Sequence, residues 1–299
     1  MMYDLIIIGG GPAGLAAAVY ALRQHLKLLL IGDQIGGRVG WRLDVPWLEA
    51  RHTISGEEVV RTLKAELQLR HLPRVLDRAT QVEAIGDHYR VRTATGEFMT
   101  KALVICTGAF PQRLGVPGEE TFYLRGLSYS AVTYASAMLD KTVAVIGDGP
   151  LALRSAAELA RAAARVYLIA ANPDCRTTVW GQWLAGLPHL TWLLGYQVEA
   201  IYGGDYVEAV AVRGPAGLQT LKVNCMFVEL GLQANTDLVA DLVDCDERGR
   251  IKVDQRNRTS QPGIFAAGDV TNVHAEQVLI AIGEGAKAGL SASTYLTEQ

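Results

Sequence analysis

The stretch Leu5-Ile6-Ile7-Ile8-Gly9-Gly10-Gly11-Pro12-Ala13-Gly14 decides the fold, because it joins a strand-like run to a helix-like run over residues 13–22. An apolar, β-branched run that ends in a glycine-rich turn and continues as a helix is typical of a βαβ unit that binds a dinucleotide. The glycines let a pyrophosphate approach the backbone, and the positive end of the helix dipole favours its charge. Residues 26–31 predict the next strand, and Asp33 follows where a ribose-binding acid is expected.

The same pattern occurs a second time in the chain. Residues 142–146 predict a strand, Gly147-Asp148-Gly149-Pro150-Leu151-Ala152 forms the turn, and residues 151–162 and 166–170 predict a helix and another strand. Two such turns within 299 residues indicate two dinucleotide sites in series, as in a protein where one redox cofactor meets another. We therefore expect an α/β chain with two Rossmann-like nucleotide-binding domains.

The remaining elements suggest how the two domains are connected. Apolar periodicity predicts helices over residues 57–70 and 131–139, a small antiparallel meander over 82–85, 88–95 and 97–99, and buried strands over 102–106 and 225–230. A helix near residues 278–290 follows the turn at Gly268-Asp269. Because this last segment looks like a continuation of the first domain, we expect the second domain to be inserted into the first.

Composition excludes several classes of partner. The net charge is −3 and no Lys/Arg-rich run occurs, so nucleic acid and anionic membranes are not expected to bind. The longest apolar runs fall far short of the about 20 residues that a membrane span needs, and no signal peptide is recognised, which predicts a cytoplasmic protein. Cys106, Cys175, Cys225 and Cys245 show neither a CxxC nor a metal-type spacing, so no metal site and no disulfide scaffold are expected.

Several motifs occur in the order and spacing of a known family. They are the first glycine turn, Gly36-Gly37, Cys106-Thr107-Gly108-Ala109 in place of ATGA, Val116-Pro117-Gly118-Glu119, the second glycine turn, a segment from Gly231 to Thr236 similar to GxxPNT, and Gly268-Asp269 followed by Gln277. In this order the chain resembles the low-molecular-weight thioredoxin reductases, two-domain flavoproteins in which an NADPH domain is inserted into an FAD domain. The resemblance covers nearly the whole chain.

This resemblance implies the domain boundaries and the cofactor contacts. The FAD domain would comprise residues 1–115 and 240–299, the second nucleotide domain residues 116–239, and the protein would be a homodimer. FAD would lie along Gly9, Gly11, Pro12, Ala13, Gly14, Asp33, Gly36, Gly37, Arg38, Val82, Thr107, Gly108, Gly268, Asp269, Gln277 and Val278. The second nucleotide would lie along Gly147, Gly149, Pro150, Leu151, Ala152, Ala170, Arg176 and Gly231.

Three departures from the family pattern argue against a conventional NADPH-dependent thioredoxin reductase. Ser130-Ala131-Val132-Thr133 stands where the family has its redox-active CxxC, and hydroxyls cannot exchange disulfides. The family's HRRxxxR segment, which grips the 2′-phosphate of NADPH, here retains only Arg176 and adds Asp174. Pro150-Leu151 and Arg154-Ser155 replace the Asp-Ser and Glu-Glu pairs of the family's second helix.

Aromatic residues accompany these changes. Tyr129, Tyr134, Trp180, Trp183 and Trp192 fall in or near the second nucleotide region, where planar rings either stack on an adenine or isoalloxazine or simply fill a core. Trp180 and Trp183 would share a face if that stretch is helical. Trp41, Trp47 and Tyr134 are candidates for shielding a flavin.

Three functions remain open from the sequence. In the first, FAD exchanges electrons with a second FAD, as in a diflavin-linked disulfide oxidoreductase variant of the family, with Cys225 and Cys245 as a candidate redox pair. In the second, the chain is an NAD(P)H-dependent flavin reductase that resembles the ferredoxin-NADP reductases. In the third, it is a flavin-binding sensor or structural protein without turnover. The redox partner would be a disulfide or thiol, a quinone or a small electron carrier.

Overall fold

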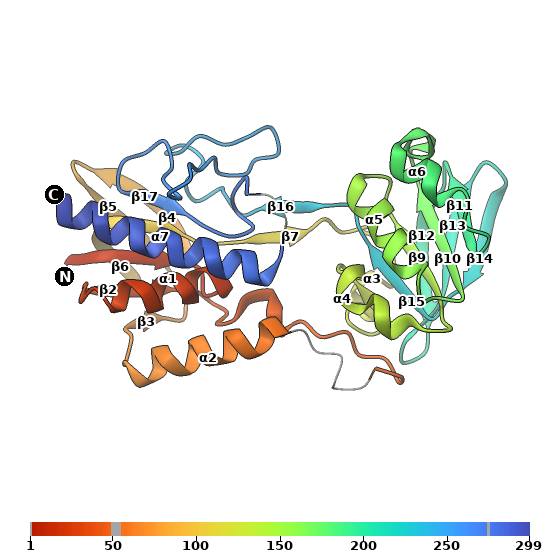
Figure 1. Ribbon diagram of the computed structural model, residues 1–299, viewed down its shortest axis with the longest axis horizontal. Coiled ribbons are helices and arrows are strands. Elements are labelled where there is room, and N and C mark those ends of the chain that lie inside the picture. The colour runs from red at the N-terminus through yellow and green to blue at the C-terminus, as the bar shows by residue number, and fades with distance from the viewer. Residues whose placement is uncertain (1, 49–54, 274–275) are drawn as a thin grey trace. The chain divides into compact units, whose positions relative to one another are not determined.

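The computed structural model describes residues 2–48, 55–273 and 276–299, and the chain divides into two compact units (Figure 1). Unit 1 comprises Met1–Gly40, Ser55–Phe110 and Gln233–Gln299, and unit 2 comprises Trp41–Ile54 and Pro111–Leu232. The chain crosses between them at strands β7 (Ala109–Pro111) and β16 (Leu232–Ala234), which pair with each other. These crossings lie a few residues before the predicted boundaries at 115 and 239, and no sequence pattern indicated that Trp41 begins a segment of unit 2.

Unit 1 is built on a seven-stranded sheet in the order β3-β2-β1-β6-β5-β4, with β17 also paired to β6. Its strands are β1 (Met2–Ile8), β2 (Leu28–Ile31), β3 (Arg74–Val75), β4 (Ala79–Ile85), β5 (His88–Thr93), β6 (Gly96–Ile105) and β17 (Ile264–Ala266). Five of these strands pair in parallel with one another: β1, β2, β3, β6 and β17. Strands β4 and β5 are antiparallel to their neighbours. This parallel core places the carboxyl ends of β1, β2, β6 and β17 at one edge.

The strand β6 corrects one prediction, because the segments expected at 97–99 and 102–106 form a single strand. β1 lies along one edge of β6, while β5 and then β17 lie along the other. Thr100 is fully buried within it, and Lys101 forms an ion pair with Asp4 at 2.9 Å. These two polar residues interrupt the apolar pattern without interrupting the strand, so the predicted meander is part of the main sheet.

Helices α1 (Pro12–Leu22) and α7 (Val278–Glu298) lie side by side on the sheet of unit 1 (Figure 1). A Cβ built at Gly285 would stand 2.0 Å from the carbonyl oxygen of Ala13, so only glycine permits this approach. Leu5 and Ile7 of β1 face this helical layer, and Ile6 and Ile8 face the core on the other side. Helix α2 (Ser55–Leu69) packs beside α1. The glycine turn joins the end of β1 to the start of α1.

Unit 2 repeats the parallel architecture and adds a second sheet. The parallel sheet has the order β11-β10-β9-β15-β8, formed by Leu190–Leu194, Arg165–Ala170, Thr142–Ile146, Cys225–Val228 and Leu127–Ser128. The second sheet is an antiparallel meander of β12 (Gln197–Gly203), β13 (Val207–Gly214) and β14 (Gly217–Lys222). Its short helices are α3 (Glu119–Phe122), α4 (Ala131–Tyr134), α5 (Pro150–Leu159) and α6 (Val179–Leu184).

The predicted helix over residues 131–139 is two shorter pieces, α4 and a 3₁₀ turn over Ala135–Met138. Tyr134 leaves the helical region at the junction, with φ −114° and ψ 4°. Its hydroxyl accepts a hydrogen bond from the Leu43 amide at 3.0 Å. Within the residues described, no helix is both long and apolar enough to cross a membrane.

Candidate functional site

In the first glycine turn, the fold requires glycine at Gly9 and Gly14, whereas Gly11 faces open space. A Cβ at Gly9, whose φ is +113°, would lie 2.1 Å from the carbonyl oxygen of Cys106, and one at Gly14 would lie 1.9 Å from that of Gly9. A Cβ at Gly11 would meet no atom within 4 Å. Pro12 begins α1, and no side chain caps its amides. The open position and the uncapped helix start together form a cradle suited to a pyrophosphate.

The segment after β2 packs against this cradle. The amide of Gly36 donates to the carbonyl of Gly10 at 2.7 Å, and a Cβ at Gly37 would lie 3.0 Å from the Cα of Gly11. Asp33 is exposed just past the carboxyl end of β2, the position expected for a ribose-binding acid. The predicted segments from Gly9 to Gly14 and from Asp33 to Gly37 thus pack against each other.

The returning chain brings its predicted residues to the same place. Gly268, at φ +79°, would place a Cβ 3.0 Å from that of Ala13 and 3.6 Å from that of Ala281, where α1 and α7 meet. Asp269 follows and forms an ion pair with Arg38. Gln277 precedes the first residue of α7 and its side chain does not cap the helix, so a second uncapped helix start lies in unit 1.

Thr107 and Gly108 complete the cluster beyond the end of β6. The Thr107 hydroxyl donates to the carbonyl of Asn235 at 2.7 Å, and the Asn235 amide side chain donates back to the carbonyl of Thr107 at 2.9 Å. A Cβ at Gly108, whose φ is +69°, would meet no atom within 4 Å. Asn235 therefore fixes the turn that carries the open glycine, a role that the GxxPNT-like motif did not reveal.

Two predicted FAD contacts receive no support from side-chain position. Val82 stands on β4, at the opposite end of the sheet order from β3, with its side chain buried in the core. Val278 packs against the start of α2, where its Cγ1 would lie 2.1 Å from a Cβ built at Gly56. Contacts of Val82 and Val278 with a cofactor stay predictions.

The second glycine turn, in unit 2, has the same division of roles. A Cβ at Gly147, at φ +142°, would lie 2.5 Å from the carbonyl oxygen of Glu229, whereas one at Gly149 would meet nothing within 4 Å. Pro150 begins α5, whose first amides are not capped by a side chain. Ala152 is buried against Gly147, with 2.9 Å between its Cβ and a Cβ built there. Unit 2 therefore presents a second cradle of the pyrophosphate type.

Four further positions were predicted to contact the second nucleotide: Leu151, Ala170, Arg176 and Gly231. Leu151 lies in the first turn of α5, half-buried. Ala170 ends β10 and is fully buried. Gly231, at φ +110°, follows β15 and is open on its Cα. The guanidinium of Arg176 lies 5.9 Å above the ring of Trp192, so this cation already makes a cation–π contact within the chain.

Two carboxylates lie near the second site, Asp148 in the glycine turn and Asp174 in the loop after β10. The Asp148 carboxylate accepts a hydrogen bond from the amide of Asn172 at 2.9 Å, which ties this loop to the glycine turn. Asn172 in turn accepts from the amide of Asp174. Burial raises the pKa of the nearby Cys175 thiol, and the negative charges of Asp148 and Asp174 raise it further. The turn and this loop therefore carry two carboxylates, and the cation Arg176 belongs to the same loop.

Ser130 and Thr133 occupy the position of the family's dithiol and lie in contact. Their hydroxyl oxygens are 2.7 Å apart, within hydrogen-bond distance. The backbone here brings together side chains at i and i+3, but each ends in oxygen. Dithiol exchange at this position is therefore chemically excluded.

A buried carboxylate near this pair was missed by the sequence reasoning. Glu229, only 5% exposed, accepts hydrogen bonds from the Ser155 hydroxyl and from the amide of Ala131, both at 2.9 Å. Ser155 is one of the residues that replace the family's Glu pair. A glutamate directly after the apolar run over residues 225–228 was the available signal.

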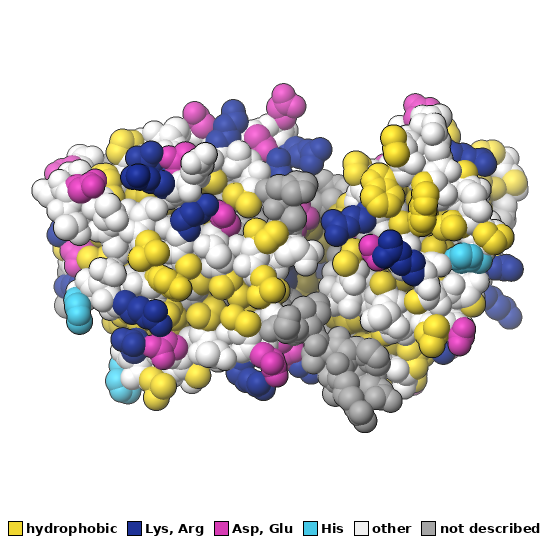
Figure 2. Space-filling view, viewed as in Figure 1, with side chains coloured by type: hydrophobic (Ala, Val, Ile, Leu, Met, Phe, Trp, Pro, Cys, Tyr) yellow, Lys and Arg dark blue, Asp and Glu magenta, His cyan; other side chains and the backbone are white. Residues whose placement is uncertain are grey.

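The aromatic residues divide into buried and exposed groups. Tyr129 donates to Glu119 at 2.7 Å, and burial together with this bond raises the pKa of Tyr129. Trp180 and Trp183 of α6 form an edge-to-face pair with centroids 6.3 Å apart, yet remain 46% and 50% exposed. Figure 2 shows hydrophobic side chains gathered over this part of unit 2. The shared face predicted for Trp180 and Trp183 is present, and α6 packs against α5.

The proposed flavin shields all belong to unit 2. Tyr134 is buried and donates to the carbonyl of Trp41 at 3.3 Å. Lys141 lies 4.8 Å above the ring of Trp47. These contacts anchor the segment that begins at Trp41 within unit 2, and a shielding role for the three aromatic residues stays a prediction.

All four cysteines are free thiols in the structure. Burial raises the pKa of Cys225 to about 12 and that of Cys106 further still, which disfavours the thiolate. Burial and the neighbouring Asp246 raise the pKa of Cys245. Cys225 lies in unit 2 and Cys245 in unit 1, so the suggested pairing stays a prediction.

Known proteins share both the sequence and the fold. The family model described as pyridine nucleotide-disulphide oxidoreductase matches residues 3–285. A relative in Pseudomonas aeruginosa, one of the subunits of alkyl hydroperoxide reductase, is 32% identical over 304 residues, which cover 98% of this chain and 58% of that relative. The chain thus spans less than two thirds of the relative's length.

Two solved structures are similar over nearly their whole length. Thioredoxin reductase from Streptococcus pyogenes superposes with a TM-score of 0.87 at 31% identity, covering 100% of this chain and 99% of the other. Thioredoxin reductase from Giardia duodenalis gives 0.85 at 25% identity, with 99% of each chain covered. These matches confirm the predicted α/β fold with two Rossmann-like domains. The chain belongs to the pyridine nucleotide-disulphide oxidoreductase family, and its fold is that of the thioredoxin reductases.

Proposed function

We propose that the chain transfers electrons between FAD bound by unit 1 and a dinucleotide bound by unit 2 whose adenosine ribose carries a free 2′-hydroxyl. The observation that carries the proposal is the environment of the second glycine turn. Its Cα at Gly149 is open, while the turn carries Asp148 and the adjoining loop carries Asp174 and the one cation Arg176 instead of a cluster of arginines. A pyrophosphate is thus accommodated, and an added phosphate on the ribose is disfavoured.

The residues of unit 1 suit FAD. The cradle around Gly11 would hold the pyrophosphate, and Asp33 would accept hydrogen bonds from the adenosine ribose. The Arg38–Asp269 pair would flank the part of the cofactor between these two groups. The uncapped start of α7 would stabilise negative charge placed beside it. FAD, when bound, supplies acceptance of a hydride and release of electrons singly or in pairs.

NADH is the first candidate for the second dinucleotide, because the description of the family names a pyridine nucleotide. A 2′-phosphate would bring about two further negative charges to the region that already holds Asp148 of the turn and Asp174 of the loop. The one cation retained from the family motif, Arg176, lies over Trp192. We therefore expect NADH to be preferred over NADPH by at least about tenfold in apparent affinity, the equivalent of one lost charged hydrogen bond.

A second FAD is the other candidate, because it shares the same adenosine half. The exposed Trp180 and Trp183 favour it, since two indoles on α6, which packs against α5, offer stacking surface to a large planar ring. In either case, electrons cannot pass through a dithiol at Ser130 and Thr133. The acceptor would meet the flavin directly, and a quinone, a small electron carrier and an exposed disulfide are the classes to compare.

Nucleotide content and anaerobic reduction test the proposal together. The purified chain is denatured, and the released nucleotides are identified and counted per chain; the native chain is then mixed with NADH or NADPH while the flavin absorbance is followed. One FAD per chain with faster bleaching by NADH supports the proposal, and two FAD per chain support its diflavin form. Bleaching by NADPH as fast as by NADH would contradict the assignment of the second site.

A matched variant sharpens this test. Asp174 is exposed, so Asp174→Arg is expected to leave the fold intact and to bring the rate with NADPH toward the rate with NADH. Glu208→Arg, in the antiparallel sheet, is the control for charge alone and should leave the ratio unchanged. An equal effect of both substitutions would show that net charge, rather than the loop, sets the preference.

A further inference from the structure

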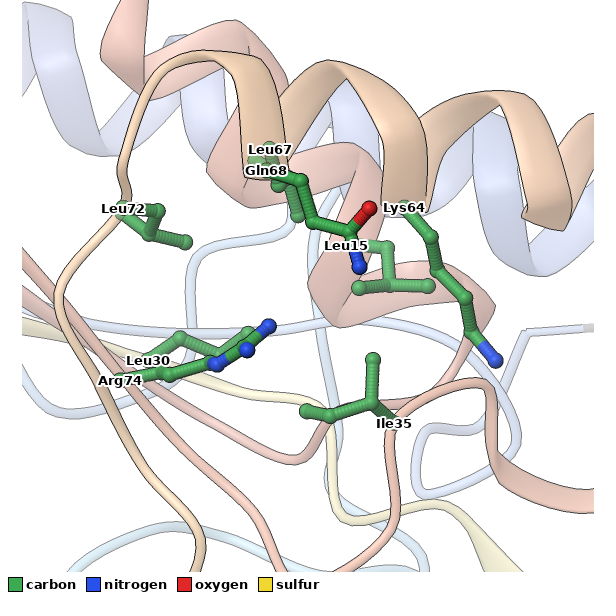
Figure 3. Close-up of a pocket in the computed structure, with 8 residues that line it drawn as sticks. All are labelled: Leu15, Leu30, Ile35, Lys64, Leu67, Gln68, Leu72 and Arg74. Carbon is green, nitrogen blue, oxygen red and sulfur yellow. The ribbon is translucent and has the colours of Figure 1, made fainter.

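A pocket of about 220 Å³ lies in unit 1 on the helical face of the sheet, between α1, α2 and β2 (Figure 3). Leu15, Leu30, Leu67 and Leu72 form its apolar floor, and all four are at most 9% exposed. These residues belong to the core beneath α1 and α2, whereas the glycine turns lie at strand ends. The volume is smaller than the roughly 300–1,000 Å³ of pockets for drug-sized ligands, so a small occupant fits.

The mouth of the pocket is polar and cationic. Lys64 and Gln68 come from α2, and Arg74 comes from β3. In Figure 3 the Arg74 guanidinium and the Gln68 amide point into the space above the leucines, and Lys64 extends along its other side. Among the described residues neither cation has an ion-pair partner, whereas Arg61 of α2 and Arg70, directly after it, pair with Glu58 and Glu66. Two unpaired cations over an apolar floor complement an anion with an apolar body.

The pocket touches the segment that supports the first glycine turn. Ile35 lines the pocket, and its Cδ1 would lie 2.8 Å from a Cβ built at Gly10. The Nζ of Lys64 would lie 2.4 Å from a Cβ built at Gly36. The same two side chains therefore border both the pocket and the turn, although the pocket contains none of the residues assigned to FAD.

We propose that this pocket binds a small amphipathic carboxylate, with its apolar chain on the leucine floor and its carboxylate at the cationic mouth that Lys64 and Arg74 line. The ligand class follows from the charge of the mouth and the volume of the floor. It does not depend on the identity of the dinucleotide in unit 2.

Octanoate is the probe, titrated below its micellar range into the purified chain with its flavin bound and followed by calorimetry and by protein NMR. We expect saturable binding of octanoate, with 1-octanol and octylammonium at least about tenfold weaker because neither offers an anion to the two cations. Arg74→Gln, at an exposed position, should weaken octanoate binding about tenfold and leave octanol unaffected. Arg61→Gln, which removes an equally exposed cation outside the pocket, is the control and should bind octanoate like the unaltered chain.

Binding of octanol as tight as that of octanoate would overturn the proposal, as would no saturable binding of octanoate at millimolar concentration. Equal losses in Arg74→Gln and Arg61→Gln would overturn it as well, since the effect would then come from net charge. Chemical-shift changes confined to unit 2 would contradict the assigned location. The flavin content of each variant is measured in parallel, so a failure of this site is distinguishable from a failure of the FAD site.

Discussion

Alanine at Gly11 separates what the first glycine turn does for the fold from what it does for a ligand. A Cβ at Gly11 meets no protein atom within 4 Å, and the residue has φ −73° and ψ −177°, which alanine adopts without strain. The smaller entropy of the unfolded chain favours the variant by about 0.4–1 kcal/mol. Loss of a good N-cap residue opposes this by roughly 0.5–1 kcal/mol. The free energy of unfolding of the flavin-free chain should therefore change by less than about 1 kcal/mol.

The effect on the cofactor should be much larger. The added methyl group would stand where the pyrophosphate approaches the backbone, and we expect FAD affinity to fall at least about 100-fold, or about 2.7 kcal/mol. Flavin content after purification and titration of the flavin-free chain with FAD, followed by fluorescence quenching, measure this loss. Urea unfolding of the flavin-free chain measures stability.

Two further alanines serve as controls. Gly149→Ala changes the equivalent N-cap residue of α5, at φ −83° and ψ 173°, and should abolish binding at the second site while FAD is retained. Gly14→Ala would force a Cβ to 1.9 Å from the Gly9 carbonyl oxygen and should destabilise the chain by more than about 2 kcal/mol. Unaltered FAD affinity in Gly11→Ala, or a loss of stability as large as that of Gly14→Ala, would refute the assignment of Gly11 to the ligand.

Three other expectations follow from single contacts. Ser155→Ala removes a donor from the buried Glu229 carboxylate and should lower the free energy of unfolding by about 1–3 kcal/mol, measured in urea. Alanine at both Trp180 and Trp183 should weaken second-site binding about fivefold to tenfold by calorimetry, and unchanged affinity would exclude stacking there. Burial raises the pKa of Cys225 from its usual 9.0 to about 12, so the protonated thiol favours the folded state. This contribution to the free energy of unfolding is fully present below pH 9. It is lost between pH 9 and 12, by up to about 1.4 kcal/mol per pH unit. Cys225→Ala should reduce that alkaline slope, and an unchanged slope would contradict the attribution.

The two glycine turns could be predicted because each rests on local chemistry. Within a dozen residues, each turn contains a strand, a glycine at which a Cβ would clash with a carbonyl oxygen, and a helix whose start no side chain caps. Residues distant in sequence were harder to place, because their roles depend on tertiary contacts. Asn235 fixes Thr107 across 128 positions of sequence, and a motif match alone does not show this bond.

The errors also have physical reasons. Thr100 and Lys101 break the apolar pattern of β6, yet one is buried through a hydrogen bond to Ala102 and the other reaches Asp4 at the surface. The antiparallel meander of unit 2 was not predicted, because β13 alternates buried and exposed residues only in part. Glu229 escaped notice because a buried carboxylate is recognised by its partners, and those partners are Ser155 and the Ala131 amide.

The hydroxyl pair of Ser130 and Thr133 limits how many electrons the chain can hold. A dithiol stores two electrons when it is reduced, so a flavoprotein that carries one can keep a reducing pair in the protein after its flavin has been reoxidised. Two hydroxyl groups exchange protons but store no electrons. At this position the chain therefore has no such reservoir, and an electron pair given up by a reduced flavin cannot wait there for an acceptor.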